Sequence, residues 1–194
     1  MDTGTLAPYL AASEVIDFHH PAVAALAREL AADDVLTTAR QCFDWVRDHI
    51  DHCIDFGRDE VPCTASQALA AGTGFCFAKS HLLVALWRAN GIPGGFGYQR
   101  LTFDGPLPPH CLHGFAVAHL PGYGWYRCDP RGNKPGISCI FDPPHEQLAF
   151  PIQYPGEYTS QTIHAEPLPE LVAHLGQVGS VARYRQQPFD FHPA

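Results

Sequence analysis

Cys76 is the residue whose surroundings most favour a reactive thiol. It follows the glycine-containing segment Gly72-Thr73-Gly74-Phe75 and stands where a helix is predicted to begin. Unpaired amides and the positive end of the helix dipole favour a thiolate at such a position. The glycines let another strand or a substrate approach the sulfur closely. Cys76 is therefore the candidate nucleophile.

His113 and Asp129 are the predicted partners of this thiol. They lie on two predicted strands that are joined by the turn-like segment Pro121-Gly122-Tyr123-Gly124. A turn centred on Pro121 would place the two residues directly opposite each other, with Cβ atoms about 5 Å apart. A carboxylate that holds one ring nitrogen leaves the other nitrogen to pair with a thiol. The three residue types thus predict nucleophilic catalysis.

Neighbouring polar residues have simpler interpretations as well. Asp129 precedes Pro130 and also fits a carboxylate that orders a turn. Arg131 and Asn133 could bind a substrate or order the same turn. The remaining cysteines are expected to be reduced, and four of them are predicted to be small buried hydrophobic residues: Cys42, Cys53, Cys128 and Cys139.

A zinc site is the competing hypothesis for the histidines. Its candidate ligands are His49, His52, Cys53, His110, Cys111 and His113. Zinc ligands normally occur as spaced pairs that project to one point. His110 follows a double proline in a predicted loop, and it would point away from His113. No metal and no cofactor are therefore expected.

The elements that must position these residues are helical in the first half of the chain. Only three of the eighteen prolines occur among the first 90 residues, and helices tolerate internal proline badly. Helices are predicted over 21–31, over 37–51 and from Thr64, where Thr64-Ala65-Ser66-Gln67 fits a capping box. A helix over 76–89 has an apolar face, and Asn90-Gly91 followed by Pro93 ends it.

The second half is predicted to form strands and loops. Strands are expected over 95–102, 113–120 and 125–129, and a short helix is expected over 169–175. Helices followed by strands indicate an α+β domain. Residues 1–194 are interpreted as a single domain, with the core motifs at about 63–133. A C-terminal wrap over 134–194 is a candidate cover for a cleft.

Two stretches carry a resemblance to a known family. GTGFCFAKSHLLVALWRANGIPGGFGYQRL at 72–101 and HGFAVAHLPGYGWYRCDPRGN at 113–133 resemble the core of the transglutaminase-like superfamily of papain-related cysteine enzymes, in a small bacterial-type member with one domain. The resemblance implies an α+β fold whose nucleophile helix packs on an antiparallel sheet. It also implies a Cys76–His113–Asp129 catalytic triad.

The chain departs from the commoner family pattern at two points. Gly114-Phe115 follows the histidine where many members have Ala-Trp, which is expected to widen the cleft. No obvious second donor for an oxyanion is visible beside the Cys76 amide; His52 is assigned, with Gln41 and Gln67 as alternatives. The calcium-binding loops of long animal transglutaminases have no counterpart.

The expected activity is thiol-dependent acyl transfer on a peptide, a protein or a small amide. Water is the favoured acceptor, which would make the protein a cysteine peptidase or amidase. An amine acceptor, as in a transglutaminase-type acyltransferase, and a catalytically silent interaction module are the alternatives. Oligomeric state and substrate identity do not follow from the sequence.

Charge and hydropathy exclude other classes of partner. The net charge is −8, and Lys79 and Lys134 are the two lysines of the chain. Without a basic run, nucleic-acid binding is not expected. No apolar stretch approaches the ~20 residues of a membrane span, and the first residues lack the basic start of a secretory signal. The sequence therefore predicts a cytoplasmic protein without a membrane partner.

Overall fold

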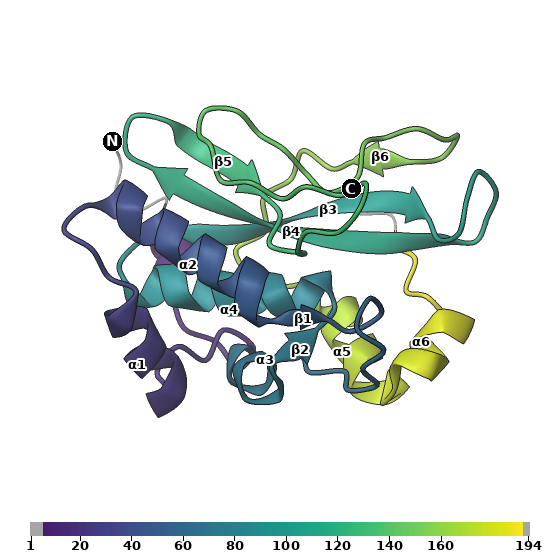
Figure 1. Ribbon diagram of the computed structural model, residues 1–194, viewed down its shortest axis with the longest axis horizontal. Helices are drawn as coiled ribbons and strands as arrows, with labels where there is room; N and C mark the ends of the chain where they lie inside the picture. Colours follow the sequence, from purple (N-terminus) through teal and green to yellow (C-terminus); the bar gives the residue numbers. More distant parts are fainter. Residues whose placement is uncertain (1–5, 192–194) are drawn as a thin grey trace.

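The computed structural model describes residues 6–191, and its centre is the long helix α4 (Cys76–Ala89). A four-stranded antiparallel sheet covers one side of α4, and three further helices cover the other side (Figure 1). Every residue of α4 from Cys76 to Arg88 is buried. This explains why the helix is apolar nearly all round rather than along one stripe.

Three helices lie on the far side of α4. They are α1 (Pro21–Glu29), α2 (Val35–His49) and α3 (Ala65–Ala71). Both halves of the capping box at Thr64 and Gln67 are present, and Gly72 ends α3 in the left-handed conformation. A short 3-10 turn, η2 (Ala7–Leu10), precedes them. The predicted helices are thus confirmed, with ends shifted by about two residues.

The sheet has the strand order β5-β4-β3-β6. Its strands are β3 (Gly94–Thr102), β4 (His110–Leu120), β5 (Gly124–Cys128) and β6 (Tyr158–Thr159). β4 begins three residues earlier than predicted, so His110 lies in the strand and not in a loop. The fold is therefore α+β, with the α4 helix packed on an antiparallel sheet, as expected.

The predicted register of the β4–β5 hairpin was wrong by two residues. Val117 pairs with Arg127, and Ala116 pairs with Cys128, so the turn is centred on Gly122 and not on Pro121. In this register, β5 ends before it reaches His113, and Asp129 follows the strand. A slip of two residues leaves side chains on the same face of the sheet. His113 and Asp129 consequently still meet.

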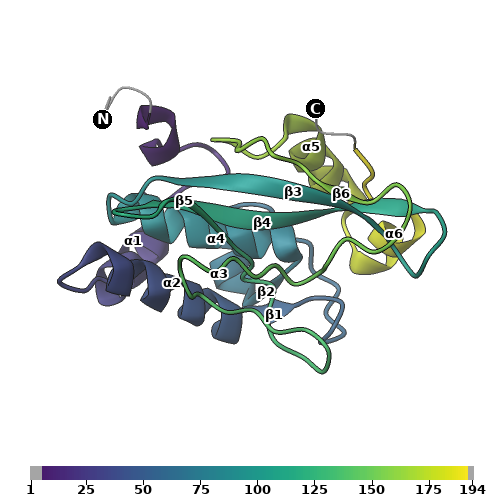
Figure 2. The same ribbon diagram turned by 90° about the horizontal axis from the view of Figure 1, so that it is seen from above.

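The C-terminal wrap adds helices α5 (Pro169–Val178) and α6 (Val181–Gln186) beside the start of α4 (Figure 2). α5 is longer than predicted, and α6 was not predicted. A two-stranded parallel pair, β1 (Asp51–His52) with β2 (Thr73–Gly74), lies at the same end of the molecule. None of the helices within residues 6–191 has the length and apolar character needed to cross a membrane.

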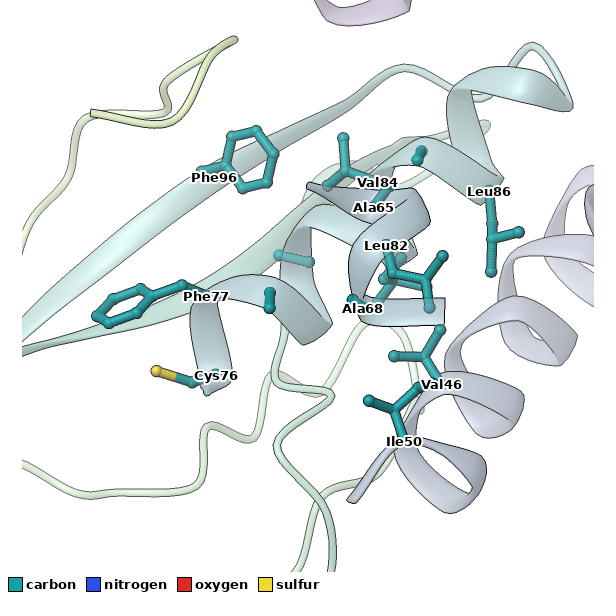
Figure 3. Close-up of a cluster of buried hydrophobic side chains, with 14 of the residues drawn as sticks. Val46, Ile50, Ala65, Ala68, Cys76, Phe77, Leu82, Val84, Leu86 and Phe96 are labelled. Atoms are coloured by element: carbon teal, nitrogen blue, oxygen red, sulfur yellow. The ribbon is translucent and has the colours of Figure 1, made fainter. Parts of the chain in front are cut away.

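The hydrophobic core surrounds α4 and extends to the site of interest. Leu82 and Leu86 of α4 pack against α1 and α2, while Phe77 and Phe96 lie on the sheet side (Figure 3). Cys76 stands at the first position of α4, at the edge of this cluster. Because the core immobilises α4, it also fixes the position of the Cys76 sulfur.

Candidate active site

Cys76 is held at the N-terminus of α4 by the strand that precedes it. β2 pairs with β1, and the Cys53 amide donates to the Gly74 carbonyl at 3.1 Å. A Cβ on Gly74 would lie 2.7 Å from the Cβ of Ala78, so only glycine allows this close approach to α4. The amides of the first turn have no partner within the helix. Cys76 is 6% exposed, and its Sγ accepts a hydrogen bond from the Gly114 amide at 3.5 Å.

His113 and Asp129 form a short buried pair. His113 Nε2 donates to Asp129 Oδ2 at 2.6 Å, and Asp129 is fully buried. The carboxylate also accepts from the Ala149 amide at 3.1 Å and from the Arg131 amide at 3.0 Å. The ring of Phe150 stands edge-on to the imidazole at 5.0 Å. Since Asp129 occupies Nε2, Nδ1 is the ring nitrogen left to interact with the Cys76 thiol.

Electrostatics favour a charged imidazole at this position. Burial opposes the charge of His113, but the Asp129 carboxylate and Cys76 outweigh it and raise the pKa of His113 to about 10. The same pairing lowers the pKa of Asp129 despite its burial. His113 is consequently an imidazolium at neutral pH, next to the sulfur of Cys76.

The other six cysteines are in a different environment. Burial raises the pKa of Cys42, Cys53 and Cys111 to about 12 and that of Cys63 and Cys139 to about 11. The pKa of Cys128 is also raised by burial. All seven thiols are free, and the four cysteines predicted to be buried are fully buried. These six thiols stay protonated at neutral pH.

A cleft of about 260 Å³ opens over Cys76 and His113. One side is mainly apolar and comes from β3, the β3–β4 loop, β4 and α6; it includes Leu101, Phe103, Leu112 and Tyr184. The C-terminal wrap therefore forms part of the cleft wall, through Phe150 and α6. The other side is polar and comes from the end of β1, the segment that follows β1 and the segment that follows β5.

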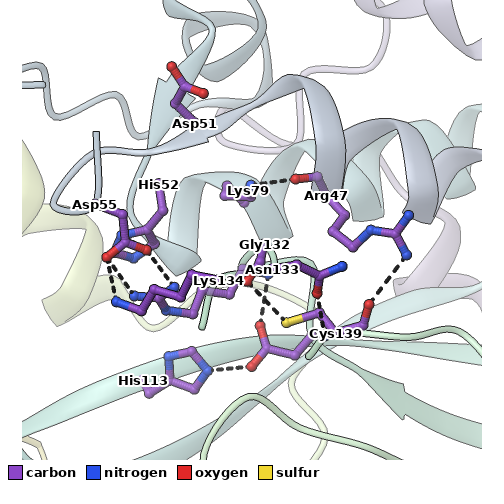
Figure 4. Close-up of polar contacts among 12 residues, drawn as sticks. Arg47, Asp51, His52, Asp55, Lys79, His113, Gly132, Asn133, Lys134 and Cys139 are labelled. Atoms are coloured by element: carbon purple, nitrogen blue, oxygen red, sulfur yellow. Dashed lines mark hydrogen bonds and ion pairs between the residues drawn. The ribbon is translucent and has the colours of Figure 1, made fainter. Parts of the chain in front are cut away.

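The polar side consists of His52, Asp55, Arg131 and Lys134. Figure 4 shows His52, Asp55 and Lys134 side by side. Asp55 binds the Arg131 guanidinium through both oxygens, at 2.6 and 3.1 Å, and accepts from Lys134 Nζ at 2.6 Å. These partners lower the pKa of Asp55 to about 2, against the effect of its partial burial. Burial, together with the charge of Arg131, lowers the pKa of His52 to about 3, so this ring is neutral.

The structure separates the three sequence candidates for the second oxyanion donor. His52 lies in the cleft, with its ring 6.3 Å from that of Phe75. Gln67 caps α3 by accepting from the Thr64 amide at 3.2 Å. Gln41 is exposed on α2 and does not line the cleft. Of the three, only His52 lines the same cleft as Cys76.

The residues proposed for a zinc site are dispersed. Within residues 6–191, no three His, Cys, Asp or Glu side chains are arranged to hold one metal ion. His110 Nε2 lies 3.4 Å from the Pro155 carbonyl. Asn133 orders the turn after β5, because its Oδ1 accepts from the Cys139 amide at 2.6 Å.

Comparison with known proteins identifies the family. Residues 24–130, more than half of the chain, match the sequence profile of the transglutaminase-like superfamily. The chain belongs to this superfamily. The match includes most of α1 and all of α2, which the sequence resemblance at 63–133 did not include. Membership supports a cysteine-type enzyme in general terms.

One solved structure shares the fold of this transglutaminase-like protein. A presumed cysteine protease from Cytophaga hutchinsonii aligns with a TM-score of 0.53 at 22% identity, over 66% of this chain and 42% of that chain. The periplasmic domain of TgpA from Pseudomonas aeruginosa aligns with a TM-score of 0.49 at 19% identity, over 67% and 48% of the two chains. The chain thus spans less than half the length of these structures. Among proteins of curated function, none matches significantly.

The sequence had suggested that Gly114 widens the cleft of this superfamily member. In the structure it does not. A Cβ at this position would lie 2.8 Å from Cδ1 of Phe77. The space next to the histidine is therefore filled by an aromatic ring of α4. The absence of a side chain allows α4 to approach β4, which brings the Gly114 amide to the sulfur of Cys76.

The cleft residues that the sequence reasoning did not name include Asp55, Lys134, Phe150 and Tyr184. Each lies outside the family motifs and reaches the cleft through a loop or through the C-terminal wrap. Lys134 had one available signal, since it is one of two lysines and directly follows the Asp129-Pro130-Arg131-Gly132-Asn133 segment. The other three have no signal in a single sequence.

Proposed function

We propose that this protein is a thiol-dependent acyl-transfer enzyme that hydrolyses a peptide or another amide bond. The observation that supports this most is the meeting of three groups in one cleft. Cys76 and His113 line the cleft, and Asp129 holds the imidazole from behind at 2.6 Å. Thiol, base and orienting carboxylate are the parts that nucleophilic catalysis by cysteine requires.

The first step is attack by the Cys76 thiolate on the amide carbonyl. The imidazolium of His113 pairs with the thiolate, because the raised pKa of His113 keeps that ring protonated at neutral pH. A carbon–sulfur bond forms and the carbonyl oxygen becomes an oxyanion. Asp129 keeps the imidazole oriented and stabilises its charge through the Nε2 hydrogen bond.

The oxyanion requires donors that are already in place. The backbone amide of Cys76 is one candidate, since it belongs to the unpaired first turn of α4. The second candidate is the neutral ring of His52, which the β1–β2 pair fixes beside the nucleophile. An N–H of this imidazole would donate to the oxyanion without itself titrating near neutral pH.

Collapse of the tetrahedral intermediate breaks the carbon–nitrogen bond. His113 gives its proton to the leaving amine, and an acyl-thioester remains on Cys76. His113, now neutral, then accepts a proton from the incoming water. Attack by the water breaks the carbon–sulfur bond, releases the acid and restores the thiolate–imidazolium pair. An amine in place of water would make the protein a transglutaminase-type acyltransferase.

Mass spectrometry of the intact protein tests this proposal. Mixing with N-acylated amides and rapid quenching in acid should show a transient mass increase of one acyl group, which peptide mapping assigns to Cys76. Cys76→Ser should form no thioester and should lose hydrolysis. Added hydroxylamine reports the acceptor, since a hydroxamate forms at the expense of the acid when amines compete with water. Hydrolysis that persists in Cys76→Ser would contradict the proposal.

A further inference from the structure

The polar side of the cleft holds more positive than negative charge. Arg131 and Lys134 share the single carboxylate of Asp55, while His52 is neutral beside them. Arg131 is only 5% exposed, whereas the Lys134 side chain is 39% exposed. Lys134 Nζ has three protons, and within residues 6–191 Asp55 is its one hydrogen-bond partner. The ammonium thus has donors left for a ligand.

This cationic group lies on the His113 side of the cleft. The Arg131 amide donates to the same Asp129 carboxylate that binds His113. The Arg131 guanidinium also lies over the Phe150 ring, 5.4 Å from its centroid, and that ring contacts the imidazole. In the proposed reaction, His113 protonates the leaving amine. Groups attached to that amine are consequently directed towards Arg131 and Lys134.

We infer that the leaving amine carries a carboxylate, which binds Lys134 and Arg131. The substrate is then an amide whose amine part is an amino acid, such as the last peptide bond of a chain with a free C-terminus. Attack by Cys76 breaks the carbon–nitrogen bond, His113 supplies the proton, and the products are an acyl-enzyme and a free amino acid. The apolar side of the cleft would take the acyl part. This inference rests on the proposed function, because that function decides which end of the substrate lies next to Lys134 and Arg131.

Alkylation tests the carboxylate site without requiring turnover. Iodoacetate and iodoacetamide alkylate the same thiol but differ in charge. The rate constant for iodoacetate divided by that for iodoacetamide, both at Cys76, should fall about fivefold in Lys134→Gln. This corresponds to about 1 kcal/mol for one partly exposed charge. Arg58→Gln is the matched control, because its side chain is 37% exposed, is ion-paired and does not line the cleft. It should leave the ratio unchanged.

Arg185 is the rival position for the carboxylate. It lines the cleft on the side of α6, and within residues 6–191 its side chain makes no hydrogen bond or ion pair. A fall of the ratio in Arg185→Gln with no change in Lys134→Gln would overturn the assignment. Equal falls in Lys134→Gln and in Arg58→Gln would overturn it as well, because they would reflect only the charge of the whole protein.

Hydrolysis then separates this inference from the proposed function. N-acetyl-phenylalanyl-glycine and its C-terminal amide share the scissile bond and differ in the leaving carboxylate. We expect kcat/KM to be about fivefold higher for the free carboxylate, and we expect this preference to disappear in Lys134→Gln through KM. Equal hydrolysis of both would contradict the carboxylate site and leave the proposed function standing. Cleavage of neither, with the alkylation ratio still dependent on Lys134, would contradict the hydrolase and retain the site.

Discussion

His113 Nε2 lies 2.6 Å from Asp129 Oδ2, in a place where the carboxylate is fully buried. Three hydrogen bonds, from His113 and from the Ala149 and Arg131 amides, replace the water that burial removes from Asp129. This arrangement keeps the carboxylate ionised and the imidazole protonated at neutral pH. It also leaves Nδ1 of the ring to the Cys76 thiol.

Loss of the Asp129 charge should reduce activity far more than it reduces folding. Asp129→Asn retains the shape of the side chain but cannot stabilise an imidazolium, so kcat should fall by at least about a hundredfold. Steady-state hydrolysis and far-UV circular dichroism measure the two effects. Asp142→Asn is the control, because the Asp142 side chain is 59% exposed and, among the residues that the structure describes, forms an ion pair with His145 alone. Equal kcat in the wild type and Asp129→Asn would show that the pair is structural.

The His113–Asp129 pair should also make stability depend on pH. The pKa of His113 is raised to about 10 in the folded state from an ordinary value of 6.5. Its contribution to the free energy of unfolding is therefore complete below about pH 6.5 and is lost as pH rises through about 10. Asp129 has a lowered pKa, so its own contribution is lost only in acid, as pH falls through its folded pKa.

Urea unfolding of the wild type and of His113→Gln, near pH 6 and near pH 10, measures this effect. The difference in the free energy of unfolding between the wild type and His113→Gln should be smaller at the higher pH. Burial lowers the pKa of Lys79 to about 8, which makes the folded state gain stability above that pH. Because both proteins contain Lys79, the comparison cancels its effect. A difference in the free energy of unfolding that is the same at both pH values would argue against an imidazolium in the folded state.

His52→Ala should lower kcat with little change in KM. One oxyanion donor typically contributes about a hundredfold to a thousandfold to kcat. The pKa of His52 is about 3, so the pH profile of the wild type should show no ionisation of this ring above about pH 5. Gln41→Ala, on the exposed face of α2, serves as the control. A change confined to KM would reassign His52 to substrate binding.

Close packing of Gly114 against Phe77 should appear as coupling between the two positions. Gly114→Ala would place a Cβ 2.8 Å from the Phe77 ring, and such overpacking typically costs about 1–3 kcal/mol of stability. Phe77→Leu should offset part of that cost when the two substitutions are combined. Urea unfolding of the four proteins gives the coupling energy. Strictly additive effects would mean that α4 and β4 can move apart without cost.

The sequence predicted secondary structure most accurately where local start and stop signals agree with burial. Helix α4 begins at Cys76 and ends at Ala89, as predicted, because an apolar run stands between a glycine-rich turn and Asn90-Gly91. Arg88 near its end is explained only by the structure. Its buried guanidinium donates to the Gly94 and Ala11 carbonyls and pairs with Glu166, so it joins three distant segments.

Register and loops were less predictable. The β4–β5 turn is composed of Pro121, Gly122, Tyr123 and Gly124, a composition that allows more than one centre. His113 and Asp129 met despite the wrong register only because a slip of two residues preserves the face of the sheet. Phe150 and Tyr184 reach the cleft through long-range packing, which one sequence does not encode in any local pattern.

Selective alkylation of Cys76 is the most direct test of the central claim, that a thiolate–imidazolium pair exists in this cleft. With iodoacetamide near pH 6, peptide mapping should show Cys76 labelled much faster than the other six cysteines, whose pKa values burial raises. His113→Ala should slow the labelling of Cys76 and leave the others unchanged. Equal labelling of all seven cysteines, or a rate at Cys76 that does not depend on His113, would contradict the account.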